Sequence, residues 1–256
     1  MCGIEYRLKD FLKPPDGHCL IVDASAGLSL GALPGLEDFA AGVRPLLPVV
    51  DGLVCSPGQV RRLGDRTRLE AGLLVRLDWS NTLRGPDFVL PVHATKRLPI
   101  LTAAEAQELG AAGMVSTFLL GYEEEIEAAC LRSTVQLALE GKQIGLPLVI
   151  EVSTSGPRVS LPGKAIELGA SYALEGGADV IVLPNPGRRS LETIAAFVSV
   201  PWMVKASSLE LAQAELDEAL SLGGCGLWLD HTVFAAPALA EMLGRLAARL
   251  HAPVTV

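Results

Sequence analysis

Short runs of valine, isoleucine and leucine alternate along the chain with longer stretches of helical period. Each run is apolar at nearly every position, as is typical of strands in a parallel sheet that helices cover. Nine such runs can be counted, one more than a closed eight-stranded barrel needs. They span residues 19–23, 52–55, 72–77, 99–102, 113–119, 148–153, 180–183, 202–205 and 226–230.

The weakest of these runs is 99–102, which we interpret as the lead-in to a helix over 103–110. Thr102 is placed to cap that helix, since Glu105 follows three residues later and completes a capping-box pattern. Without this run, eight strand–helix units remain. The other helices are expected over residues 4–12, 123–141, 163–175, 191–199, 209–222 and 237–250.

Eight strand–helix units in 256 residues match a closed barrel better than an open sheet. We therefore predict an α/β fold, a (β/α)8 TIM barrel forming a single domain over 1–256, with residues 1–18 as an N-terminal lead-in segment. An open doubly wound sheet is the weaker alternative, because no GxGxxG follows the first run and no Walker sequence is present.

Charge and composition restrict the partners. Lys+Arg is 21 against Asp+Glu 29, and the formal net charge of -8 disfavours binding to nucleic acid or an anionic membrane. No apolar run approaches the roughly 20 residues that span a bilayer. The five cysteines lack CxxC spacing, as expected of reduced thiols. We expect a soluble cytoplasmic protein without a cofactor, and the high mean hydropathy of +0.38 predicts a homo-oligomer.

Polar residues at the carboxyl ends of the strands are the candidate site, because active sites of such barrels lie at that end. For serines and threonines among them, a helix-capping role is the alternative. The expected catalytic residues are Lys205, Asp23, Glu151, Asp230 and His231. The expected substrate-binding residues are Arg76, Asp78, Ser80, Ser153, Asn185 and Ser207.

Lys205 has the most unusual placement of these residues, at the end of an apolar strand. Burial disfavours its charged form, so its pKa is expected to fall if its surroundings are apolar. Glu151 lies within a strand and is the natural partner of Lys205, and a purely structural ion pair remains an alternative. His231 is either a proton donor or a cap. No two histidines share metal-ligand spacing, so we expect no metal.

Several motifs, taken in order, resemble a known family. Residues 20–23 (LIVD), 77–87 (LDWSNTLRGPD), 176–187 (GGADVIVLPNPG) and 223–234 (GGCGLWLDHTVF) are similar to segments of the archaeal-type class I fructose-bisphosphate aldolases and of deoxyribose-phosphate aldolase. The resemblance covers residues 20–250. It implies a (β/α)8 barrel whose lysine forms a Schiff base with a carbonyl substrate.

The chain departs from the family at functional positions. The family's Schiff-base lysine corresponds to Leu183, its acid/base tyrosine to about Ser153, and its phosphate-binding glycine–arginine pair to Asp230 and His231. Residues 204–207 (VKAS) resemble the seventh strand of deoxyribose-phosphate aldolase, which carries a second lysine. In that enzyme the second lysine depresses the pKa of the Schiff-base lysine. Here we expect Lys205 to take over the nucleophile's role, because a lysine desolvated among apolar residues can be a free amine near neutral pH.

Three functions follow from this pattern. The first is an aldolase-like lyase on a small, unphosphorylated carbonyl substrate, with an imine on Lys205 and with Asp23, Glu151 or Asp230 moving protons. The second is a non-imine acid/base enzyme, such as an isomerase or a carbon–carbon bond-forming enzyme, which uses Asp23, Asp230 and His231. The third is a non-catalytic relative that binds a metabolite or serves as a subunit of an assembly.

Overall fold

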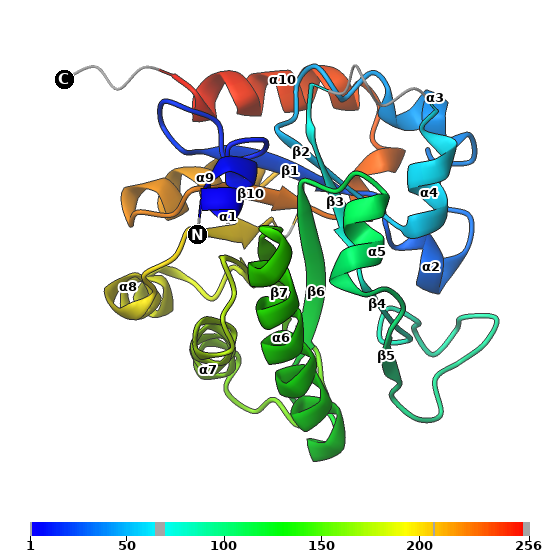
Figure 1. The fold of residues 1–256 in the computed structure, drawn as a ribbon, viewed down its shortest axis with the longest axis vertical. Coiled ribbons are helices and arrows are strands. Elements are labelled where there is room, and N and C mark those ends of the chain that lie inside the picture. Colours follow the sequence, from blue (N-terminus) through cyan, green and yellow to red (C-terminus); the bar gives the residue numbers. More distant parts are fainter. Residues whose placement is uncertain (1, 65–69, 207, 253–256) are drawn as a thin grey trace.

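A computed structural model describes residues 2–64, 70–206 and 208–252, and within them eight parallel strands close into a barrel (Figure 1). The predicted (β/α)8 fold is confirmed. The spatial order is β1-β10-β9-β8-β7-β6-β3-β2. The strands are β1 (Cys19–Asp23), β2 (Gly52–Cys55), β3 (Gly72–Arg76), β6 (Gly113–Leu119), β7 (Leu148–Ser153), β8 (Val180–Pro184), β9 (Trp202–Lys205) and β10 (Gly226–Leu229).

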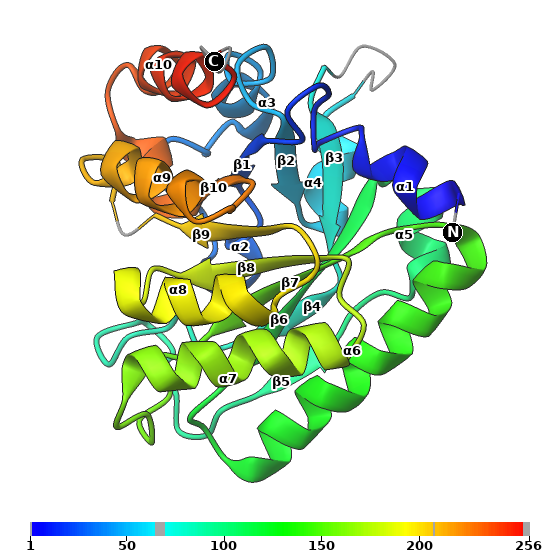
Figure 2. The same cartoon turned by 90° about the vertical axis from the view of Figure 1, so that its left-hand side faces the viewer.

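Helices cover the outside of the barrel, and Figure 2 shows α6 to α9 lying against it. The predicted capping box at Thr102 and Glu105 is present, as is a second one at Ser56 and Gln59. The helices are α1 (Cys2–Leu8), α2 (Gly27–Leu30), α3 (Phe39–Val43), α4 (Pro57–Arg62), α5 (Ala103–Glu108), α6 (Glu124–Ile144), α7 (Pro162–Glu175), α8 (Arg188–Phe197), α9 (Ala212–Ser221), the 3-10 helix η1 (His231–Ala235) and α10 (Leu239–Leu250).

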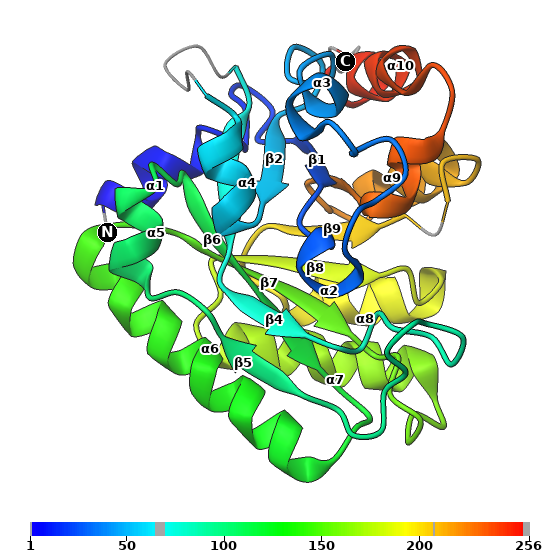
Figure 3. The same ribbon diagram turned by 90° about the vertical axis from the view of Figure 1, so that its right-hand side faces the viewer.

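Residues 99–102 are not part of the barrel, as predicted. The first of these residues ends a short strand, β5 (Arg97–Pro99), which pairs antiparallel with β4 (Asp78–Ser80). Figure 3 shows this two-stranded ribbon beside the barrel. The long segment 79–98 is therefore tied at both ends by strand pairing and lies next to α2.

The N-terminal lead-in closes the barrel at the amino ends of its strands. Phe11 is completely buried and packs in one cluster with residues inside the barrel, including Leu74, Val115 and Trp228. A Cβ atom added to Gly72 would lie 2.9 Å from the Cβ of Phe11. Glycine at this position of β3 lets the backbone of Asp10 and the Cβ of Phe11 approach closely, and the lead-in thus packs against the amino end of the barrel.

Side chains of β8 alternate between the barrel interior and the helix layer. Val180 and Val182 pack in the interior cluster, whereas Ile181 and Leu183 pack against the helices. Leu183 thus points away from the cavity. The interior position at this level is Val182, which pairs with Glu151 on β7. Among the described helices, none is long and apolar enough to cross a membrane.

His251 ties the end of α10 to the amino end of the barrel. Its Nδ1 lies 3.0 Å from Asp16 Oδ2, and its Nε2 lies 3.0 Å from Asp51 Oδ2. Partial burial lowers the pKa of His251, but the two carboxylates outweigh that effect and raise it above its ordinary value. Asp51 also accepts a hydrogen bond from the Leu20 backbone, so the histidine is linked to β1.

We predict that His251→Gln destabilises the protein in a pH-dependent way. Because the pKa of His251 is raised in the folded protein, its protonation stabilises the fold fully at pH values below the ordinary pKa of about 6.5. This stabilisation is lost as the pH rises through the pKa of the folded state. Urea unfolding should show a loss of about 1 kcal/mol at pH 6 and a smaller loss at pH 9. The exposed His93→Gln is the control. Equal losses at both pH values for His251→Gln would contradict this reading.

Candidate active site

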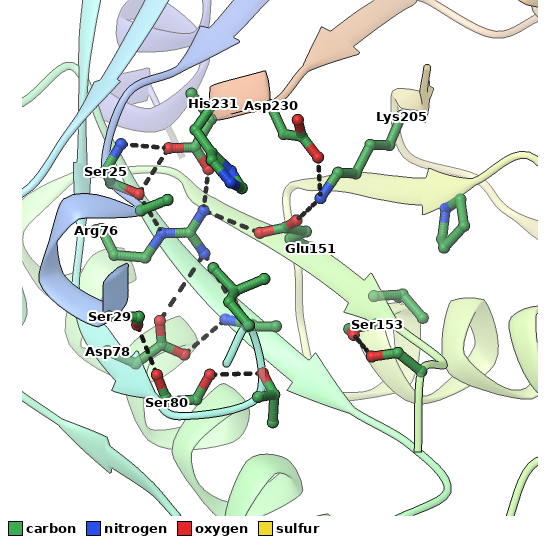
Figure 4. A pocket seen from close by; sticks show the side chains of 18 of the residues that line it. Ser25, Ser29, Arg76, Asp78, Ser80, Glu151, Ser153, Lys205, Asp230 and His231 are labelled. Carbon is green, nitrogen blue, oxygen red and sulfur yellow. Dashed lines mark hydrogen bonds and ion pairs between the residues drawn. The ribbon is translucent and has the colours of Figure 1, made fainter. Parts of the chain in front are cut away.

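A cavity of about 490 Å³ opens at the carboxyl ends of the barrel strands (Figure 4). Strand alternation directs the last polar side chains of β1, β3, β7 and β9 into it, while the loops after the strands supply hydroxyl and amide groups. The predicted site residues that line it are Asp23, Arg76, Asp78, Ser80, Glu151, Ser153, Asn185, Lys205, Asp230 and His231. Ser207 lies outside the described residues.

Arg76 lies at the centre of the charged network. Its NH2 group contacts Asp23 Oδ2 and lies 2.9 Å from Glu151 Oε2. Its Nε donates to Ser25 Oγ at 3.0 Å, and its NH1 donates to Thr117 Oγ1 at 2.7 Å. Burial alone lowers the pKa of Arg76, yet the surrounding carboxylates raise it, so the guanidinium stays charged. These contacts engage all three of its nitrogens, and Arg76 holds the site together.

Lys205 lies between two carboxylates. Its Nζ is 3.0 Å from Glu151 Oε1 and 3.3 Å from Asp230 Oδ2. The predicted pairing with Glu151 is confirmed. The expected fall in the lysine pKa is wrong, because burial lowers it but Glu151 and Asp230 raise it well above its ordinary value. Lys205 is therefore an ammonium ion within this network.

The two carboxylates beside Lys205 differ in accessibility. Burial raises the pKa of Glu151, but Lys205 and Arg76 lower it to about 2, so Glu151 stays ionised. Burial likewise raises the pKa of Asp230, and Lys205 and Thr232 lower it below its ordinary value. The side chain of Asp230 is 24% exposed and that of Glu151 is 10% exposed. Asp230 is thus the carboxylate with more access to a bound molecule.

Arg97 is a residue that the sequence did not reveal. It is buried against Asp78, with its NH2 2.8 Å from Asp78 Oδ2, and it also donates to Ser116 Oγ at 2.7 Å. Asp78 accepts a further bond from the Thr117 backbone at 2.7 Å. This arrangement fastens the ribbon of β4 and β5 to β6. It uses Asp78, which was predicted to bind substrate, mainly as an anchor.

The remaining predicted residues occupy the rim. Ser153 Oγ lies 3.1 Å from Ser155 Oγ, and Ser80 Oγ lies 2.8 Å from Thr82 Oγ1. Asn185 accepts a hydrogen bond from the Gly187 backbone at 2.9 Å and donates toward α9. His231 begins η1 and borders the cavity. Hydroxyl pairs of this kind can turn toward a ligand at little cost.

The donor set of the site suits proton transfer and carbonyl chemistry. Within residues 2–64, 70–206 and 208–252, no group of three His, Cys, Asp or Glu side chains is arranged to hold a metal ion. A primary amine and four carboxylates line the cavity at the carboxyl ends of the strands. The fold and the site together define a (β/α)8-barrel protein with a lysine in the cavity at the carboxyl ends of its strands.

Comparisons with known proteins agree with this class. No family model matches the chain. It is 24% identical over 254 residues to an uncharacterized aldolase of Pasteurella multocida (97% of this chain and 83% of the relative). It is 26% identical over 244 residues to 2-amino-3,7-dideoxy-D-threo-hept-6-ulosonate synthase of Halobacterium salinarum (92% and 88%). A solved Schiff-base-forming fructose-1,6-bisphosphate aldolase superposes with a TM-score of 0.78 at 20% identity (97% and 100%).

These relatives and structural neighbours belong to the class I aldolase superfamily that includes the archaeal-type fructose-bisphosphate aldolases. The resemblance drawn from the sequence is thereby confirmed.

We predict that Arg76→Met is strongly destabilising, because it leaves Asp23 and Glu151 buried without their shared cation. The free energy of unfolding should fall by about 3–5 kcal/mol. Arg188→Met is the matched control, since Arg188 forms an exposed pair with Glu192 at 3.0 Å, and its loss should cost less than about 0.5 kcal/mol. Similar losses in both variants, measured by denaturant unfolding, would contradict a central role for Arg76.

Proposed function

We propose that the protein is an aldolase-like lyase that makes or breaks a carbon–carbon bond in a small carbonyl substrate through an imine on Lys205. The observation that carries this proposal is the position of the Lys205 amine in the mouth, 3.3 Å from the accessible carboxylate of Asp230. The aldolases among its relatives support the reaction class. An imine former needs an amine and a nearby proton carrier, and these two groups meet that need.

Asp230 is the proton carrier in this proposal. The Lys205 ammonium passes a proton to Asp230, and the neutral amine adds to the carbonyl carbon. Asp230 returns the proton to the former carbonyl oxygen and takes one from the nitrogen. The hydroxyl of the carbinolamine then leaves as water with the proton of Asp230, and an iminium ion remains. Glu151 stays ionised throughout and stabilises the positive nitrogen.

The carbon–carbon bond breaks from this iminium ion. Asp230, again ionised, takes the proton of the β-hydroxyl group, and the bonding electrons move into the iminium to form an enamine. A carbonyl fragment leaves. Protonation of the enamine carbon and hydrolysis of the imine release the second fragment and restore the lysine.

Other residues of the site bind the substrate in this scheme. The hydroxyls of Ser80 and Ser153 and the amide of Asn185 hydrogen-bond to substrate oxygens, and His231 exchanges protons with solvent at the rim. Asp23 and Arg76 keep Glu151 in place. The role of Ser207 as a further contact is carried over from the sequence.

We predict that borohydride traps an adduct on Lys205 when dihydroxyacetone is supplied. The trapped fraction, measured by peptide mass spectrometry, should rise between pH 6 and pH 9. At pH values below the raised pKa of Lys205, each rise of one pH unit increases the fraction of free amine about tenfold. Lys205→Met should lose the adduct. Lys164→Met, which changes an exposed lysine, should keep it. Absence of an adduct on Lys205 across a panel of aldehydes and ketones would rule out the imine.

The raised pKa of Lys205 favours a second candidate, a non-imine acid/base enzyme. A permanent ammonium beside a substrate carbonyl stabilises an enolate without forming a covalent bond. Asp23, Asp230 and His231 then exchange the protons, as in an isomerase. Turnover that persists in Lys205→Arg, which keeps the charge but forms no imine, would favour this candidate over the lyase.

The protein acts in this proposal as a cytoplasmic homo-oligomer. The described free cysteines Cys19, Cys55, Cys130 and Cys225 agree with a reducing compartment. The outer face of α6 carries an apolar stripe, in which Leu131, Val135 and Leu139 are 39%, 41% and 58% exposed. This spacing is symmetric about Val135. If two copies of α6 cross antiparallel at Val135, Leu131 of one copy packs against Leu139 of the other. The acidic first turn of one helix then lies beside the last turn of the other, which holds Lys142.

We predict that Val135→Glu weakens this self-association, because it places like charges opposite each other on the two-fold axis. Light scattering coupled to gel filtration should show an oligomer for the unchanged protein and a smaller species for Val135→Glu. Leu90→Glu, at an exposed leucine of the 79–98 segment, should leave the size unchanged. An oligomer that tolerates Val135→Glu would place the interface elsewhere.

A further inference from the structure

The place where barrels of this kind commonly bind phosphate is occupied by a carboxylate. That place is formed by the loops after the seventh and eighth strands and the start of a short extra helix. Here the corresponding elements are β9, β10 and η1. The Asp230 carboxylate accepts hydrogen bonds from the Thr232 backbone at 3.0 Å and from Thr232 Oγ1 at 2.6 Å. At the start of η1, both the backbone N–H and the hydroxyl of Thr232 are thus already bonded to a fixed negative charge.

The neighbouring loop after β8 is filled in a similar way. The side-chain oxygen of Asn185 accepts the backbone N–H of Gly187 at the start of α8. This second amide is therefore also used by the protein itself. The backbone N–H groups of Thr232 and Gly187 are therefore both bonded to side-chain oxygens of the protein.

The charge of the cavity opposes an anion as well. Among its described lining residues, Asp23, Asp78, Glu151 and Asp230 are acidic, and both cations, Arg76 and Lys205, are already paired with them. A phosphate dianion would enter a site with an excess of negative charge, where the low dielectric strengthens repulsion. An uncharged substrate meets no such barrier.

Two leucines line one wall of the cavity and are held in place. Leu28 of α2 and Leu83 of the segment after β4 both line the cavity, and they are 38% and 47% exposed. Trp79 Nε1 donates to the Leu28 carbonyl at 2.9 Å, and Arg84 Nε donates to the Ser29 carbonyl at 3.0 Å. These bonds fix α2 against the loop. Two exposed leucines on a fixed wall provide a surface for an apolar group of a ligand.

We infer that the substrate is an uncharged carbonyl compound with a short apolar group, and not a sugar phosphate. The carbonyl and its hydroxyl neighbour lie at Lys205 and Asp230, and the apolar group packs on Leu28 and Leu83. The carbonyl chemistry rests on the proposed function, whereas the choice of ligand rests on the charges and the apolar wall.

Binding and turnover test the inference separately. Calorimetry should show that hexanal and 2-hexanone bind at least tenfold more tightly than dihydroxyacetone phosphate and glyceraldehyde 3-phosphate, in the unchanged protein and in Lys205→Met. In aldol assays, the same order should appear in kcat/KM. Tighter binding of the phosphorylated compounds would overturn the inference. Correct binding order without turnover or trapping would instead reject the proposed lyase activity and leave the ligand assignment supported.

Variants of the apolar wall provide the second test. Leu28→Ser and Leu83→Ser should each weaken hexanal binding about tenfold, which is the size expected when an apolar contact of a pocket is lost. Leu90→Ser, in the same segment but not lining the cavity, is the matched control and should bind hexanal as the unchanged protein does. Equal binding in all three variants would show that the leucines do not contact the ligand.

Discussion

Arg76 is the centre of the charged network that lines the cavity. This guanidinium is buried, and burial of a charge is tolerated only where partners surround it. It joins Asp23 on β1 to Glu151 on β7, two strands that are not neighbours in the barrel. Glu151 in turn holds Lys205 on β9. One side chain thus sets the positions of groups from four strands.

The same network gives the lysine its protonation state. A lysine in an apolar barrel would be a neutral amine, whereas here Glu151 and Asp230 keep it charged. The charge makes Lys205 a good electrostatic group and a slow nucleophile. A nearby proton acceptor that a substrate can reach is then required for imine chemistry, and Asp230 provides it. The acidic residues of the cavity thus both keep Lys205 charged and provide the acceptor for its proton.

The barrel was predictable because its strands are apolar on both faces, and the runs of valine, isoleucine and leucine mark them directly. Because both faces are apolar, the sequence does not reveal which side chains of a strand point into the barrel and which point toward the helices. Val182 and Leu183 are both fully buried, so their composition says nothing of direction, and only the observed packing separates interior from exterior. The partner of Lys205 was predictable, since Glu151 is a strand carboxylate. The role of Arg97 was not, because Asp78 lies 19 residues away across a loop.

The burial of Phe11 at the amino end of the barrel determines the route that water and products take. Because Phe11 and the residues around it fill the interior at the amino end, the cavity lies at the opposite, carboxyl end of the strands. In the proposed cleavage reaction, the fragment without a bond to the protein departs first, and the fragment bound to Lys205 follows after water has hydrolysed the imine. Phe11 confines water and both products to the carboxyl end of the barrel, although it lies at the opposite end from them.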